Sequence, residues 1–413
     1  MKANALTKPR TIFRQHWSCS KMPLSLFFSQ FLMYKRTHLF SAACTAIFLF
    51  GIGLITLGAV LPSLKEKFQL DEVSAGALFS ILPFGILMGS LIFGPISDRF
   101  GYKALLILSQ LFMVAGFEGI AYAPSLGLLQ VCVFLFGMGG GAINGATSAL
   151  IADTSTYSKG SDLSLLGVFF GLGALSMPFI TGLLKGYLSF VEIISAVGMI
   201  TLLASLSLFL IRFPPPKHVQ GFPLTKAVTL LKDSVIILIA LFLFFQSSFE
   251  GIINNWTTSY LLQHKGIPEN QALYALSLYL AGMTVMRFLI GTVFRKVVPH
   301  KLLLASLCLI LAGCLILLIS HSLTGAIFGL ILVGAGLGGG FPIMLGYVSN
   351  RYADLSGTAF SFVLVVALIG NMLINYLMGW IAHKYGIHHL INVALAELAC
   401  LGFLFILIRR RLR

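Results

Sequence analysis

Long apolar runs separated by short polar segments make up most of the chain. The runs hold few or no charges, while lysine, arginine and the acids gather between them. A helix needs roughly 20 mostly apolar residues to cross a bilayer. The pattern therefore predicts twelve membrane-spanning helices, at residues 38–62, 73–97, 103–122, 124–152, 162–187, 190–212, 233–262, 270–294, 301–319, 323–350, 356–381 and 387–409.

Composition supports a protein whose solvent is the lipid bilayer. Of the 413 residues 58% are apolar and only 10% are charged, with a mean hydropathy of +0.95. In a soluble protein the net charge of +15 would suggest a nucleic-acid partner, but in a membrane protein it marks cytoplasmic loops, so we expect no nucleic-acid binding. The six cysteines show no CxxC spacing and predict neither a metal site nor a disulfide framework.

A proline-led linker divides the predicted spans into six plus six. We expect a basic tail at residues 1–37, a six-helix bundle at 38–212, a linker at 213–232 that contains Pro214 to Pro216, and a second bundle with a short basic tail at 233–413. The predicted fold is an all-α membrane protein with two pseudo-symmetric six-helix bundles. We assign no function to the first tail.

The distribution of positive charge predicts the orientation. Of the 28 lysines and arginines, 22 lie in segments on the side that holds both termini, five lie on the other side, and Arg287 falls inside a span. Positive residues concentrate in cytoplasmic loops. We therefore expect a multi-pass protein of the cell inner membrane with both termini in the cytoplasm.

Glycine runs suggest that the two bundles are copies of each other. The pattern Gly-x-Gly-Gly-Gly at 137–141 recurs at 336–340, a shift of 199, and Gly94 corresponds to Gly291 at a shift of 197. Duplicated halves predict such offsets. The alternative is that glycine is common wherever membrane helices pack closely.

The segment between the second and third spans carries a family motif. Gly94, Asp98, Arg99, Gly101 and Lys103 stand at the spacing G-x-x-x-D-R-x-G-x-K, which resembles the signature of the major facilitator superfamily. Glycine suits a close helix approach at the first position and a tight turn at the fourth. The resemblance implies that this segment controls the inner gate. At the matching place of the second half, Arg295 stands where the acid would be.

The seventh span contains the most informative polar residues. Gln246, Glu250 and Asn254 stand at i, i+4 and i+8, on one face of a helix, with Asn255 and Trp256 one step around. Ionisable groups at bilayer depth are costly and are usually functional. Carboxylate and amide groups beside an aromatic ring suit sugar binding. The alternative is an interhelical hydrogen-bond cluster.

The stretch from Glu250 to Tyr260 also resembles span seven of the fucose-proton symporters and related sugar carriers, and Leu61-Pro62 after the first span agrees. Those symporters carry acids where this chain has Gly58 and Asn144. Their route for protons is therefore missing here. Glu250 remains the candidate for proton coupling.

Polar residues in other spans complete the expected site. Asn144, Asn371, Asn375 and Tyr279 lie on spans that line the cavity throughout the resembled family. Each asparagine could equally be a helix-packing amide. Arg287 is expected to reach the headgroups, and we interpret Glu397 in the twelfth span as a packing or partner contact.

The sequence as a whole predicts a secondary active transporter that moves a small polar solute, a sugar, by alternating access with possible proton coupling. We expect a monomer that is not an enzyme and needs no cofactor or metal; no GxxxxGK[ST] loop for ATP is present. The alternatives are an exporter of amphipathic drugs or metabolites, and a membrane sensor that binds without transporting.

Overall fold

Twelve helices long and apolar enough to cross a membrane are found in the part of the chain that the structure describes. The computed structural model describes residues 35–154, 159–214, 233–352 and 356–411. The expected tail at 1–37 and linker at 213–232 lie largely outside these ranges. The elements are α2 (Arg36–Phe68), α3 (Glu72–Tyr122), α4 (Leu126–Thr154), α5 (Lys159–Leu184), α6 (Phe190–Ser207), η1 (Leu208–Leu210), α8 (Ser234–Gln263), α9 (Glu269–Gly291), η2 (Val293–Lys296), α10 (Pro299–Ile319), α11 (Leu323–Leu337), α12 (Gly340–Arg351), α13 (Ser356–Tyr385), η4 (Ile387–His389) and α14 (Leu390–Arg411).

Two elements do not correspond one to one with a span. Helix α3 contains the second and third spans, joined at Gly101, whose φ of 79° and ψ of 165° interrupt the helix. A positive φ is readily adopted only by glycine, which confirms the tight turn expected at this motif position. The tenth span is divided between α11 and α12, with the break at Gly338 and Gly339.

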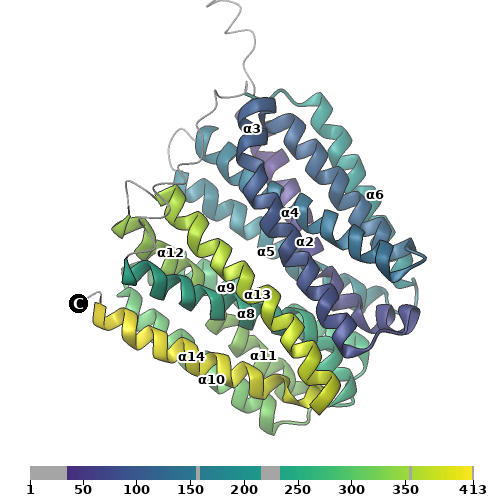
Figure 1. Cartoon of the computed structure of the whole chain (residues 1–413), viewed down its shortest axis with the longest axis vertical. Helices are drawn as coiled ribbons and strands as arrows, with labels where there is room; N and C mark the ends of the chain where they lie inside the picture. Colours follow the sequence, from purple (N-terminus) through teal and green to yellow (C-terminus); the bar gives the residue numbers. More distant parts are fainter. Residues whose placement is uncertain (1–34, 155–158, 215–232, 353–355, 412–413) are drawn as a thin grey trace, which may run out of the picture.

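The helices form two bundles with matching internal packing (Figure 1). Helix α2 packs on α5 in the first bundle as α8 packs on α13 in the second. The same relation holds for α3 with α4 against α9 with α11, and for α3 with α6 against α10 with α14. In Figure 1 the purple-to-teal helices fill the upper right and the green-to-yellow helices the lower left. The predicted fold of two pseudo-symmetric six-helix bundles is confirmed.

Close helix contacts fix the register of this repeat. A Cβ atom added to Gly137 would lie 2.3 Å from the Leu82 carbonyl oxygen, and one added to Gly334 would lie 2.0 Å from that of Tyr279. Both members of the second pair are shifted by 197 residues. The same shift relates Gly141 beside Ile86 to Gly338 beside Met283. The offset of 199 read from the glycine runs is therefore wrong by two residues, because close packing, rather than the letter pattern, marks equivalent positions.

Among the described residues, the contacts between the bundles that position the site lie from the middle of the membrane spans toward one end. We call the side where α2 begins and α14 ends the terminal side, and the opposite side the distal side. On the distal side Lys185 of α5 pairs with Glu269 of α9, and His383 of α13 lies 3.9 Å from Asp71 at the start of α3. Nearer the middle, the Ser277 hydroxyl of α9 donates to the Leu175 carbonyl of α5 at 2.8 Å. The bundles are thus sealed together on the distal side.

Candidate functional site

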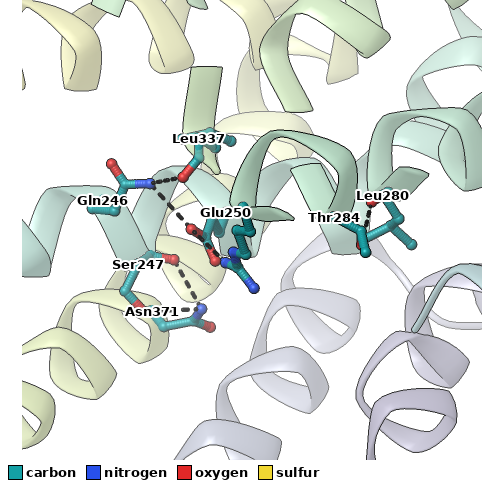
Figure 2. A network of polar contacts seen from close by, with 8 residues as sticks. Gln246, Ser247, Glu250, Leu280, Thr284, Leu337 and Asn371 are labelled. Carbon is teal, nitrogen blue, oxygen red and sulfur yellow. Dashed lines mark hydrogen bonds and ion pairs between the residues drawn. The ribbon is translucent and has the colours of Figure 1, made fainter. Parts of the chain in front are cut away.

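Gln246 and Glu250 form a polar pair one turn apart on α8. The Gln246 Nε2 atom donates to Glu250 Oε1 at 3.1 Å and to the Leu337 carbonyl oxygen at 3.0 Å (Figure 2). Leu337 is the last residue of α11, and the final carbonyls of a helix have no partner within it. The break in the tenth span therefore supplies an acceptor that holds Gln246, whose side chain is buried.

Arg287 of α9 completes this group, and its placement was not expected. Its Nη2 atom lies 3.7 Å from Glu250 Oε1. The expectation that Arg287 reaches the headgroups is wrong, because a carboxylate in a neighbouring span gives the cation a partner inside the bundle. The charge of Arg287 within a predicted span was the signal available from sequence, but its partner depends on how α8 and α9 pack.

A second group joins α8 to α13 through amides. The Asn371 Nδ2 atom donates to the Ser247 carbonyl at 2.9 Å (Figure 2), and Asn375 Nδ2 donates to the Asn371 carbonyl at 2.8 Å. Asn375 Oδ1 in turn accepts from Asn255 Nδ2 at 3.0 Å and from Trp256 Nε1 at 3.2 Å. The spacing of Asn371 and Asn375 by one turn puts both on the face that meets α8.

Trp256 lies at the boundary between the bundles. Its ring is fully buried and meets the ring of Phe79 in α3 edge-on, with centroids 5.4 Å apart. In this conformation the indole packs on a residue of the other bundle and its N–H is used by Asn375. The Trp256 indole, which was expected to stack on a solute, therefore helps to close the distal side in this conformation.

Asn254 sits at a close approach of α2 to α8. A Cβ atom on Gly58 would lie 2.3 Å from the Asn254 carbonyl oxygen, so only glycine fits at this place. This contact gives a packing reason for glycine where the resembled symporters carry an acid. The Asn254 Oδ1 atom is buried and has no hydrogen-bond partner among the described residues.

Tyr279 and Asn144 stand apart from the two networks. Tyr279 is fully buried on α9, near enough to Glu250 and Arg287 to interact with them electrostatically, and its hydroxyl has no partner among the described residues. Asn144 is exposed on α4, one turn from Gly140, which faces Phe50 of α2. The structure does not bring Asn144 into contact with the α8 residues.

The expected gate motif is described only in part. The Lys103 Nζ atom donates to the carbonyls of Phe209 at 2.8 Å and Ile211 at 3.1 Å, so it caps the end of the sixth span. The side chains of Asp98 and Arg99, like the surroundings of Gly94, lie outside the described part of the structure. The gating role of these residues stays a prediction.

Glu397 is buried on α14 and faces Ser248 of α8, on another side of that helix, without a well-formed hydrogen bond. This placement agrees with a packing contact. Among the described residues no three histidine, cysteine, aspartate or glutamate side chains gather as a metal site would require. The polar groups of α8, α9 and α13 can instead bind a hydrogen-bonding solute and hold a proton on a carboxylate.

Comparisons with known proteins agree with this architecture. The family model described as Major Facilitator Superfamily matches residues 43–374. The inner membrane transport protein YdiN of Escherichia coli (strain K12) is 25% identical over 87% of this chain and 85% of its own length. The glucose/mannose transporter GlcP of Bacillus subtilis (strain 168) is 26% identical over 84% of this chain and 88% of its own.

The fold is also found among solved structures. The nucleoside transporter NupG, solved as a point mutant, superposes with a TM-score of 0.77 at 14% identity, over 90% of this chain and 98% of its own. Such a likeness concerns the fold alone. Twelve spans, a duplicated bundle and a family model that covers most of the sequence lead to one conclusion: the chain is a transporter of the Major Facilitator Superfamily.

Proposed function

We propose that this transporter carries a small polyhydroxylated solute of the sugar class, with Glu250 as the site of a coupling proton. The observation that carries the proposal is the presence of two polar groups along α8: Gln246 with Glu250 on one face, and the amides that α8 shares with Asn371 and Asn375 of α13. Amides offer a donor and an acceptor side by side, which matches neighbouring sugar hydroxyls. The relative GlcP, named as a glucose/mannose transporter, is consistent with this class.

In this conformation most of these polar groups bind one another. A solute would replace those internal hydrogen bonds, and the free acceptor of Asn254 and the free hydroxyl of Tyr279 mark places where it gains bonds not now made among the described residues. The protein would act as a monomer in the cytoplasmic membrane, with its terminal side facing the cytoplasm. Because the bundles are sealed on the distal side, this conformation would be the one open to the cytoplasm.

Counterflow in proteoliposomes tests the transport of sugars. Vesicles loaded with unlabelled D-glucose should take up labelled D-glucose faster than vesicles without protein, and D-mannose and D-xylose should be compared in the same way. Binding of a sugar without exchange would show a sensor. If no sugar is exchanged and amphipathic dyes move outward instead, the protein is an exporter of amphipathic compounds.

Glu250→Gln tests the role of the carboxylate. The variant should abolish accumulation driven by a proton gradient and retain counterflow, which needs no net proton movement. Glu66→Gln is the matched control, because Glu66 is exposed at the distal end of α2. If Glu250→Gln accumulates sugar as wild type does, Glu250 is not the proton site.

A further inference from the structure

Arg287 lies at the end of a stripe on α9 that packs along α5 of the other bundle. The stripe includes Ser277, which bonds to α5, and Thr284, seven residues later, whose Oγ1 atom would lie 2.7 Å from a Cβ on Gly171. Positions seven apart share a helix face, and Arg287 follows Thr284 by three residues. The arginine therefore continues the face that α9 turns toward the first bundle, one turn nearer the terminal side.

The bundles separate at the level of Arg287. Gly171 of α5 touches α9, but a Cβ on Gly167, one turn toward the terminal side on the same face of α5, would meet nothing within 4 Å. Arg287, whose side chain is 33% exposed, thus borders open space rather than a packed interface.

The guanidinium of Arg287 has unused hydrogen-bonding capacity. It carries five N–H donors, yet among the described residues its one partner is Glu250, at 3.7 Å, which is longer than a hydrogen bond. Its Nε atom is buried and has no acceptor in the part of the chain that the structure describes. A buried charged donor without a partner is costly, and a carboxylate is the group whose geometry fits the two-pronged face of arginine.

We infer that Arg287 binds a carboxylate of the transported solute. This inference rests on the proposed function and narrows the solute from sugars in general to sugar acids and similar hydroxylated carboxylates. A single guanidinium neutralises one negative charge, so a monoanion fits better than the dianion of a phosphate ester. Tyr279, whose hydroxyl has no described partner beside this group, and Asn254 add bonds to the hydroxyl groups of the same solute.

The Glu250 carboxylate competes with the solute for Arg287. Two carboxylates facing one guanidinium repel each other, so the solute binds most readily when Glu250 carries a proton, and Gln246 then remains as its partner. Among the described residues, the other groups that face this site include no second acid: Tyr279 comes from α9, Gly58 from α2 and Asn371 from α13. Glu397 of α14 lies at Ser248, on another side of α8. Proton and carboxylate would therefore enter together.

Paired sugars that differ at one carbon test this inference. D-glucuronate carries a carboxylate where D-glucose carries a hydroxymethyl group, and both are titrated against the purified full chain in detergent, with D-glucose 6-phosphate as the phosphate arm. We expect D-glucuronate to bind at least about tenfold tighter than D-glucose, because a hydrogen bond between charged groups contributes enough binding free energy for a change of that size. Arg287→Gln should remove this preference, so that D-glucuronate and D-glucose bind the variant with affinities within about twofold of each other.

Further outcomes separate this inference from the proposed function. Equal binding of both sugars to wild type, a preference for D-glucose 6-phosphate, or a preference for D-glucuronate that survives Arg287→Gln would overturn the role of Arg287 and leave sugar transport standing. Binding of no member of the set would overturn both. Glu250→Gln mimics the protonated acid, so it should bind D-glucuronate with no dependence on pH. Unaltered pH dependence in this variant would refute the competition with Glu250.

Discussion

The ring of Phe79 in the first bundle meets the ring of Trp256 in the second edge-on, with centroids 5.4 Å apart, on the distal side of the site. The same indole donates its N–H to Asn375, which ties the contact to the amide network of α8 and α13. A pair that belongs to different bundles must part when the distal side opens. This contact therefore links the state of the gate to the polar residues beneath it.

Phe79→Ala should shift the molecule toward a state open on the distal side. The aromatic contact exists only in the sealed state, so its loss destabilises that state and leaves the open state unaffected. Aromatic pairs contribute about 0.5–1.5 kcal/mol beyond the area they bury. Spin labels at Tyr187 and Gln263, both exposed at the distal ends of different bundles, should show a larger population of long distances. Leu91→Ala, an exposed position on α3, is the control, and an unchanged distance distribution in Phe79→Ala would contradict the prediction.

Arg287→Leu should destabilise the protein more than the double variant Arg287→Leu with Glu250→Gln. The single change leaves a carboxylate without its cation inside the bundle, whereas the double change removes both charges. Because both side chains are partly exposed, we expect a cost of about 2 kcal/mol, below the roughly 3–5 kcal/mol of a fully buried pair. Melting temperatures in detergent measure this. Equal loss in both variants would show that the pair does not stabilise the fold.

Gly137→Ala and Gly334→Ala should both lower stability, since each added methyl group would overlap a backbone carbonyl of the neighbouring span. Overpacking of this kind typically costs about 1–3 kcal/mol. Gly402→Ala on α14, where no atom lies within 4 Å, is the matched control and should gain up to about 1 kcal/mol from helix propensity. Similar losses at the two sites would support the repeat at 197 residues, and a loss at one site alone would argue against it.

Asp71 should make stability dependent on acid pH. The side chain and backbone of Ser74 hydrogen-bond this helix cap, and His383 lies nearby; together they hold the pKa of Asp71 below its usual value. A lowered pKa in the folded state gives stability that is present above the unfolded value of about 3.9 and is lost as the pH falls through the folded value. Asp71→Asn should keep the cap and lose this part of the dependence. Identical acid transitions in both proteins would refute the assignment.

The residues of α8 show how far the sequence predicts a site in this protein. The spacing of Gln246, Glu250 and Asn254 places them on one face of a helix whatever packs against it, because the helical period is fixed by backbone geometry. Their partners were not predictable. Gln246 is held by a carbonyl exposed by the break after Leu337, 91 residues away, and Glu250 by an arginine expected at the headgroups.

The sequence by itself determined the twelve spans and the fold class, because bilayer thickness and the cost of unpaired backbone in lipid leave few ways to arrange long apolar runs. The tertiary structure alone decided the repeat register of 197 residues, the seal between Phe79 and Trp256, and the pairing of Glu250 with Arg287. These relations depend on helices far apart in the chain, and a local pattern sets the direction of a side chain from its own helix but not the neighbour that it meets.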